Sequence, residues 1–308
     1  MNELYMGIDI GTPGVRAALF DADGRQVSIE YREYPMICTQ PGMYELYTFV
    51  VFSAFLEVAG KCVENSGAAS SRIQAIGLST QLFSFLAVDG NGNCLTNLIT
   101  LADNRSLEQT EAISRTFDCA SLYNATGCRV QHPMYPLSKI LWLKETQPDT
   151  FMRAYKFVSI KEYINFKLFG GFYIDYTDAS ASACFNIHSF DWDDNIVSNV
   201  LGLRKDMLRE PVECTYTLKG MRNEYAAVMG IREDIPVAIG SGDGILANAG
   251  CGVFDDTVMS CTVGTSGALR IAVGSPLLDE WQRTWCYCFT KDTWVAGGAV
   301  NNGGIVLK

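Results

Sequence analysis

The chain has 308 residues, of which 48% are hydrophobic and 19% charged, a composition typical of a globular protein with a substantial core. Its length predicts two domains of about 100–200 residues each. Its formal net charge of −10 argues against nucleic-acid and anionic-membrane partners, because both require basic surface patches.

The first part of the chain predicts a mixed sheet with a crossover helix. Apolar, β-rich runs predict strands over residues 4–10, 15–20 and 26–31, joined by turns that contain glycine. Residues 45–64 have the apolar spacing of a long buried helix, and a further strand follows at residues 73–79. A helix between strands of one sheet is typical of α/β proteins.

The rest of the chain alternates shorter elements. We expect strands over residues 85–88, 98–101, 236–239, 285–289 and 294–298. We expect helices over residues 106–116, 136–146, 159–168 and 245–252. Residues 191–194 are expected to form a solvated loop, and the tryptophans near the C-terminus are most simply core or interface residues: Trp281, Trp285 and Trp294.

A hairpin motif occurs twice. Residues 6–20 align without a gap with residues 259–273, and each copy reads strand, Gly-Thr-x-Gly turn, strand. Glycine lacks a Cβ and allows positive φ, so backbone N–H groups of such a turn can point at a bound anion. Two distant turns of this kind predict two lobes that hold one phosphate chain, as in actin-like ATPases and sugar kinases. The candidate phosphate-binding residues are Gly11, Thr12, Gly264, Thr265 and Ser266.

Asp9 lies two residues before the first turn, inside an otherwise apolar strand. A carboxylate in this place can hold Mg²⁺ beside the phosphates of a nucleotide, usually through water. The alternative is an aspartate that only forms a turn. The second hairpin has Thr262 at the matching position, so only one lobe offers the carboxylate.

Asp243 follows a buried strand and precedes a helix. Open α/β sheets bind ligands at the carboxyl ends of their strands. Asp243 therefore suits a general base that accepts the proton of an attacking hydroxyl, and the alternative is a simple helix N-cap.

Two further segments end strands at the same edge. Asp103 and Arg105 can bind sugar hydroxyls or a carboxylate, or else form a helix cap and a surface charge, and both interpretations stay open. Gln81 is a weaker candidate, and its neighbours Leu82 and Phe83 complete the substrate candidates. His132 lies in a loop and is expected to be structural.

The eleven cysteines are scattered without a CxxC pair, so we expect reduced thiols. The N-terminal residues lack the pattern of a signal peptide, and no apolar run approaches the roughly 20 residues of a membrane helix. These observations predict a cytoplasmic protein without a membrane partner.

Seven segments resemble the FGGY family of carbohydrate kinases, in the family's order and over nearly the whole chain: residues 7–12, 95–105, 126–136, 158–163, 242–248, 263–267 and 297–302. Within that family the likeness is greatest to gluconokinases and then to xylulokinases. The resemblance implies the ribonuclease-H-like α/β fold of the actin-like superfamily, in two lobes with a cleft between them.

The resemblance also implies transfer of the γ-phosphate of ATP to a sugar or sugar-acid hydroxyl. Asp243 matches the family's catalytic base, and Asp9 matches its Mg²⁺-associated carboxylate. Phe83 stands where relatives commonly have a sugar-contacting histidine, and Leu101 stands where they commonly have tryptophan. Pro13 replaces the usual hydroxyl residue of the first turn.

Family members continue well past residue 308. We therefore expect residues 1–250 to form the sugar-binding lobe and residues 251–308 to begin a nucleotide-binding lobe that is incomplete. Exposed apolar surface at that lobe predicts association with another chain, for example as a homodimer. The alternative functions are a sugar-binding remnant without the adenosine site, and a chaperone-like or filament-forming relative of actin.

Overall fold

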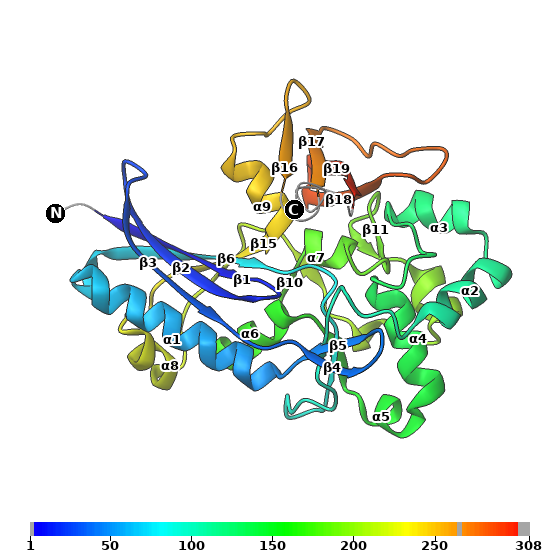
Figure 1. The fold of residues 1–308 in the computed structure, drawn as a ribbon, viewed down its shortest axis with the longest axis horizontal. Coiled ribbons are helices and arrows are strands. Elements are labelled where there is room, and N and C mark those ends of the chain that lie inside the picture. The colour runs from blue at the N-terminus through cyan, green and yellow to red at the C-terminus, as the bar shows by residue number, and fades with distance from the viewer. Residues whose placement is uncertain (1–2, 264–266, 301–308) are drawn as a thin grey trace.

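The computed structural model describes residues 3–263 and 267–300. Its centre is a six-stranded sheet with the order β14-β15-β6-β1-β2-β3 (Figure 1). The chain enters this sheet as an antiparallel meander, and β1 then pairs parallel with β6, which pairs parallel with β15. The strands are β1 (Leu4–Ile10), β2 (Gly14–Asp21), β3 (Gln26–Glu33), β6 (Ile73–Thr80), β14 (Thr217–Leu218) and β15 (Val237–Gly242).

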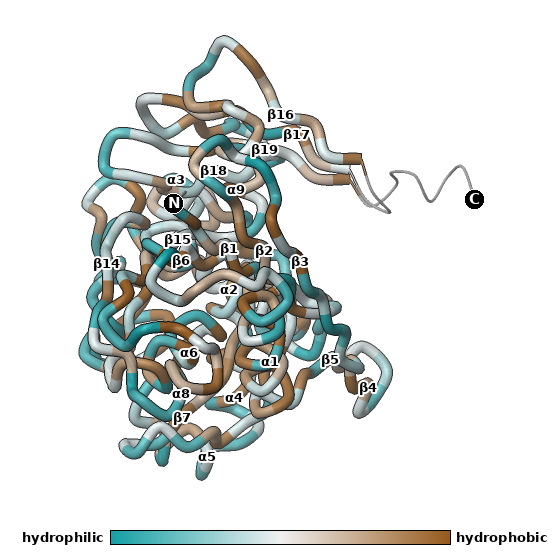
Figure 2. Tube along the Cα trace, turned by 90° about the vertical axis from the view of Figure 1, so that its left-hand side faces the viewer, coloured by the Kyte–Doolittle hydropathy of each residue, from teal (hydrophilic) through white to brown (hydrophobic). Residues whose placement is uncertain are grey.

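One face of this sheet is covered by α1 (Thr48–Ser66), with α8 (Asn223–Met229) beside it (Figure 1). In β1 the alternate side chains from Leu4 to Ile10 are buried against this layer, whereas Tyr5 on the opposite face is 41% exposed. This alternation is the period of two expected of a strand with one covered face. In Figure 2, where α1 is seen nearly end-on, brown hydrophobic segments lie around its label.

A second core unites the middle of the chain with its C-terminal part. The middle contributes five helices: α2 (Leu107–Thr116), α3 (Cys119–Thr126), α4 (Pro136–Thr146), α5 (Pro148–Arg153) and α7 (Tyr176–Ser180), whereas α6 (Ile160–Phe169) packs in the core of the six-stranded sheet. The C-terminal part is a four-stranded sheet of β16 (Met259–Val263), β17 (Gly267–Val273), β19 (Thr293–Val300) and β18 (Trp285–Thr290). Leu137 and Tyr176 share one hydrophobic cluster with Cys286 and Val295, so this core crosses residue 250.

Short strand pairs complete the fold. One sheet joins β4 (Ile37–Gln40), β5 (Met43–Leu46) and β8 (Leu98–Ile99). The remaining pairs are β7 (Leu86–Val88) with β9 (Lys156–Val158), β10 (Ile174–Asp175) with β13 (Pro211–Val212), and β11 (Phe185–Asn186) with β12 (Asp191–Trp192). Each cysteine of the chain is free. Within residues 3–263 and 267–300, no helix is both long and apolar enough to cross a membrane.

The link from β15 to α9 (Asp243–Gly250) depends on glycine. The pairing of β15 with β6 shifts register before Ser241, and Gly240 has φ of 67° at this shift. A Cβ on Gly240 would lie 1.7 Å from the carbonyl oxygen of Leu78. Any side chain at residue 240 would clash with Leu78, so glycine is required there. The register shift changes the direction of β15 just before the strand ends at the edge of the sheet.

Two expectations from the sequence are wrong, and a third is narrowed. The long helix begins at Thr48, because Glu45 belongs to β5, pairs with β8 and bonds to Arg105. The 191–194 segment is not a solvated loop, because Trp192 is buried in β12. Trp281 is 69% exposed and so lies outside the core, whereas a place at an interface stays a prediction for it.

Candidate functional site

The carboxyl ends of β1, β6 and β15 bring the candidate carboxylates to one edge of the sheet. The register places Asp9 beside Ser79, and Ser79 beside Ser241 of the next strand. The hydroxyl of Ser79 donates to Oδ1 of Asp9 at 2.7 Å. Asp243 follows two residues after Ser241, so two carboxylates that are far apart in sequence occupy the same edge.

Two clefts meet at Asp243. The arginine-lined cleft has a volume of about 440 Å³, and its lining includes Phe83, Arg129, His132, Asp243, Arg270 and Arg283. The carboxylate-lined cleft has a volume of about 430 Å³, and its lining includes Asp9, Ser79, Asp243, Gly244, Thr262 and Arg270. Because Asp243, Gly244 and Arg270 line both clefts, they lie at the passage between them.

Asp243 is the first residue of α9, and Gly242 holds the N-cap position. Among the described residues, the carboxylate of Asp243 accepts one hydrogen bond, from the backbone N–H of Gly244 at 2.7 Å. The pKa of Asp243 is raised, chiefly because surrounding protein displaces water from its carboxyl, and the charge of Asp9 adds to this effect. A carboxylate with a raised pKa and few internal partners is suited to accept a proton.

Arg270 reaches the passage from β17. Its Nη1 donates to the hydroxyl of Thr262 at 3.0 Å, and its guanidinium lies next to the backbone of Gly244. Loss of water lowers the pKa of Arg270, whereas the charge of Asp243 opposes this change. Arg270 thus supplies a positive charge where the two clefts meet.

Other cationic groups line the arginine-lined cleft. Arg283 is held by Asp279 through bonds of 2.6 and 2.9 Å, so its charge is largely neutralised. Within the described part of the chain, Arg129 has no acidic partner and no side-chain hydrogen bond. The pKa of His132 is lowered, first by loss of water and then by the charge of Arg129. Asp243 is the one carboxylate in the described lining of this cleft.

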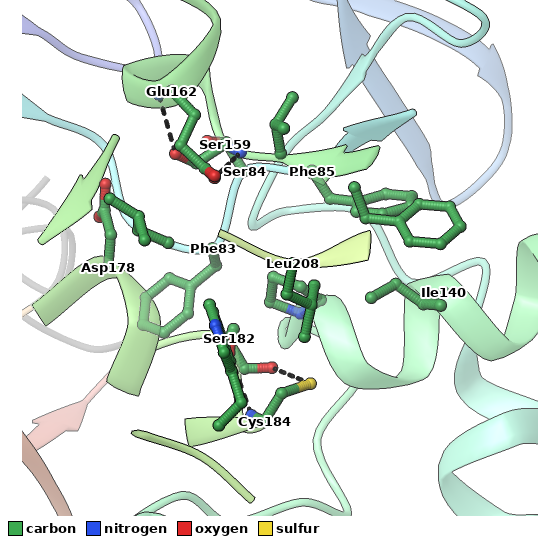
Figure 3. A pocket seen from close by; sticks show the side chains of 15 residues that line it. Phe83, Ser84, Phe85, Ile140, Ser159, Glu162, Asp178, Ser182, Cys184 and Leu208 are labelled. Carbon is green, nitrogen blue, oxygen red and sulfur yellow. Dashed lines mark hydrogen bonds between the residues drawn. The ribbon is translucent and has the colours of Figure 1, made fainter. Parts of the chain in front are cut away.

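Phe83 forms part of the wall of the arginine-lined cleft and has φ of 65°, in the left-handed region that only glycine enters without cost. Its ring lies edge-on to Tyr135 and Tyr287. Phe83 also lines a second, buried cavity of about 40 Å³. In the close view of this cavity, the ring of Phe83 lies between Asp178 and Ser182 (Figure 3). Leu82 is buried beside Phe83 and also lines the cleft.

Gln81 is buried and serves the first Gly-Thr turn. The hydroxyl of Thr12 donates to Oε1 of Gln81 at 3.0 Å, and Nε2 of Gln81 donates to the carbonyl of Gly11 at 3.4 Å. The N–H of Gly11 donates to the carbonyl of Gly14 at 3.0 Å. These groups therefore have partners inside the protein, and Gln81 holds the turn rather than lining either cleft.

The structure does not bring Asp103 and Arg105 to the lining of either cleft. Asp103 is fully buried, and its oxygens accept hydrogen bonds from Tyr44 and Arg105. Arg105 also bonds to Glu45 at 2.6 Å and lies over the ring of Trp142. This buried ion network joins β5 to the segment after β8.

Gly264, Thr265 and Ser266, the candidate residues of the second turn, lie outside the described residues. Sequence reasoning missed Arg129 and Arg270. Arg270 could have been found, because it lies three residues after the Gly-Thr-Ser-Gly turn in a strand predicted to approach phosphate. Arg129 carries no such signal, because only folding brings its loop to the cleft.

Comparison with known proteins gives consistent results. Residues 4–250 match the N-terminal domain of the FGGY family of carbohydrate kinases. The chain is 36% identical over 308 residues to a gluconokinase from Bacillus subtilis (strain 168), covering all of this chain and 59% of the relative. It is 26% identical over 264 residues to a xylulose kinase from the same organism, covering 86% of this chain and 52% of the relative.

The solved structures agree. A gluconate kinase from Lactobacillus acidophilus superposes with a TM-score of 0.94 at 32% identity, over 99% of this chain and 61% of that one. The chain thus spans about three fifths of the length of these relatives. Its fold is that of the actin-like sugar kinases, as the sequence predicts. The chain belongs to the FGGY family of carbohydrate kinases.

Proposed function

We propose that this chain provides the substrate site and catalytic base of an ATP-dependent kinase that phosphorylates a hydroxyl of a sugar or sugar acid, gluconate-like first and xylulose-like next. The observation that carries the proposal is the position of Asp243 and Arg270 at the passage between two clefts. A sugar in the arginine-lined cleft and a phosphate chain in the carboxylate-lined cleft would then meet at these two residues.

Asp243 would accept the proton of the attacking hydroxyl. Its raised pKa makes it a stronger base, provided that it remains ionised at the working pH. Arg270 lies beside it and would stabilise negative charge on the transferred phosphoryl group. Phosphoryl transfer depends mainly on such positioning and charge stabilisation.

The carboxylate-lined cleft has oxygen donors that fit Mg²⁺: the carboxylates of Asp9 and Asp243 and the hydroxyl of Ser79. Within the described residues, no group of three or more histidine, cysteine, aspartate or glutamate side chains could hold a metal ion, so Mg²⁺ would keep water and phosphate oxygens in its shell. Mg²⁺ bound there would neutralise charge on the phosphates of ATP. Asp9 would orient it, with its own carboxylate held by Ser79.

The lining of the arginine-lined cleft supports an acidic substrate. Arg129 and Arg270 have no salt-bridge partner among the described residues, and Asp243 is the one carboxylate that opposes them. A substrate carboxylate would satisfy a free guanidinium, whereas a neutral ketose would leave it unpaired. This charge balance agrees with the gluconokinase relatives.

Calorimetric titration with gluconate and with xylulose, each with and without Mg-ATP, tests the proposal. We expect gluconate to bind more tightly than xylulose, and Mg-ATP to strengthen the binding of the sugar acid. Failure of both compounds to bind would overturn the proposal.

Asp243→Asn should separate binding from transfer. We expect the rate of phosphoryl transfer to fall by about 10²–10⁴, the usual contribution of a general base, while gluconate binding stays within a few fold. Asp255→Asn is the matched control, because Asp255 is exposed, lines neither cleft and, among the described residues, forms hydrogen bonds with Thr257 alone. Retained transfer by the Asp243 variant would remove Asp243 as the base.

One observation favours a second candidate, a protein that binds the sugar acid without transferring phosphate. In the first turn, Pro13 has no N–H, and the N–H of Gly11 and the hydroxyl of Thr12 are already bonded within the protein. Gluconate binding without gluconate-dependent consumption of ATP would identify this function.

A further inference from the structure

Lys139 is an unusual buried cation. It lies on α4, its side chain is fully buried, and it forms no salt bridge within the described residues. Its Nζ donates instead to three backbone carbonyls: Phe83 at 3.2 Å, Thr100 at 2.8 Å and Met134 at 2.7 Å. An ammonium group has three N–H donors, so all of them are used.

The three carbonyls belong to three separate segments of the cleft wall. Phe83 follows β6, Thr100 follows β8, and Met134 precedes α4. Phe83, Met134 and Leu101, the residue after Thr100, all line the arginine-lined cleft. One side chain thus joins three segments that are distant in sequence and that face the same cleft.

The segment at Phe83 needs such support. A non-glycine residue in the left-handed region is disfavoured, and it persists only where its surroundings hold it. Lys139 bonds to the carbonyl of this residue, while Tyr135 and Tyr287 contact its ring. Burial lowers the pKa of Lys139 to about 7, and the charge of Asp103 opposes this shift.

We propose that Lys139 is a positioning residue for substrate binding: its ammonium group fixes Phe83, Leu101 and Met134 relative to one another in the wall of the arginine-lined cleft. The link to substrate rests on the function proposed above. The anchoring of the three segments is independent of what the cleft binds.

Lys139→Met tests both parts, because it keeps most of the side-chain volume and removes every donor. Lys156→Met is the matched control, since Lys156 is also buried, donates to a backbone carbonyl (Asp206, 2.6 Å) and lies away from the cleft. The measurements are gluconate affinity by calorimetry and hydrogen exchange of the segments 81–86, 99–104 and 132–136. Lys139→Gln, which keeps one donor group, replaces Lys139→Met if the latter does not fold.

We expect Lys139→Met to weaken gluconate binding at least about tenfold and to speed exchange in all three segments together. Lys156→Met should change neither quantity. Unchanged exchange in the three segments, or a uniform rise over the whole chain, would overturn the positioning role. If the parent protein binds neither gluconate nor xylulose, the proposed function fails, and the exchange measurement alone still decides the role of Lys139.

Discussion

Arg129 is the side chain on which recognition of a sugar acid most directly depends. It lines the arginine-lined cleft and has no acidic partner among the described residues, whereas Arg283 in the same cleft is held by Asp279. We expect Arg129→Gln to weaken gluconate binding about tenfold and to leave xylulose binding nearly unchanged, because only gluconate carries a carboxylate. Calorimetric titration of both compounds measures this.

Arg283→Gln is the control for Arg129. Since Asp279 already neutralises Arg283, we expect a smaller loss of gluconate affinity from this substitution. An equal loss of gluconate affinity in the two variants would contradict this role, and so would an equal loss of xylulose affinity. Either result would show that Arg129 affects the shape or the overall charge of the cleft and does not recognise the carboxylate.

Glu162 should make stability depend on pH. It is 2% exposed, and burial raises its pKa to about 8, although hydrogen bonds with Ser159 oppose the rise. Between its ordinary value near 4.5 and about 8, the folded state keeps a proton that the unfolded state releases. The free energy of unfolding should therefore fall as pH rises through this window, by up to roughly 1.4 kcal/mol per pH unit.

Glu162→Gln removes this titration while keeping an oxygen acceptor for the N–H of Ser159. Relative to the parent, the variant should become more stable from pH 5 to pH 8 in urea denaturation. Glu108→Gln, at an exposed glutamate in the first turn of α2, should give a curve parallel to the parent. Parallel curves for both variants would contradict the raised pKa.

At the scale of single residues, the sequence predicts position better than role. Asp9 and Asp243 end strands, and strand ends at one edge meet, so their proximity follows from the pattern alone. Arg105 is an equally reasonable substrate-binding candidate in the sequence, but in the structure it bonds to Glu45, a residue 60 positions away. Long-range pairs of this kind have no local signal, which is why the partner of a charged residue cannot be read from its neighbours.

At the scale of elements, Gly127 at the end of α3 has two reasons to be glycine. The helix cap needs a positive φ, and the neighbouring strand β18 leaves no room for a side chain. Gly127 caps α3 with φ of 67°, and a Cβ there would lie 2.1 Å from the carbonyl oxygen of Cys286 in β18. Gly67 caps α1 with φ of 61°, but a Cβ there would meet nothing within 4 Å. Both glycines therefore have the left-handed backbone conformation, but only Gly127 lies against a neighbouring strand.

Alanine at these two glycines should therefore differ in cost. Gly67→Ala carries only the left-handed penalty, and we expect a loss of about 1–2 kcal/mol in the free energy of unfolding. Gly127→Ala also forces β18 to move, which should add about 1–3 kcal/mol. Urea denaturation of both variants measures the difference, and equal losses would show that β18 yields without cost.

Elements that bury one regular face could be predicted, and short ones could not. The alternation in β1 and the long apolar stripe of α1 are visible in the sequence, and both elements form as expected apart from the first residues of α1. The five-residue helix α7 is too short to show a helical period of apolar residues in the sequence. It is stabilised instead by the N-cap of Asp175 and by contacts with β18.

At the scale of the whole molecule, hydrogen bonds to the backbone of β18 hold the C-terminal sheet against the middle of the chain. The N–H of Cys286 donates to the carbonyl of Gly127 at 3.0 Å, and the N–H of Cys288 donates to the hydroxyl of Ser180 at 3.1 Å. The hydroxyl of Thr177 donates to the carbonyl of Cys288 at 2.7 Å. The sequence order suggests a boundary near residue 250, but these contacts and the shared core could not be inferred from it.

This fastening predicts that β18 opens only with the core beneath it. The amides of Cys286 and Cys288 should exchange with solvent through the same unfolding event as those of α3 and α7, because their acceptors lie directly after α3 and on α7, two helices of that core. Hydrogen exchange at increasing urea measures this, and the free energies of opening should converge before the global transition. Exchange of β18 at a lower urea concentration than α7 would show instead that the C-terminal sheet is a separate cooperative unit, despite the hydrophobic cluster that crosses residue 250.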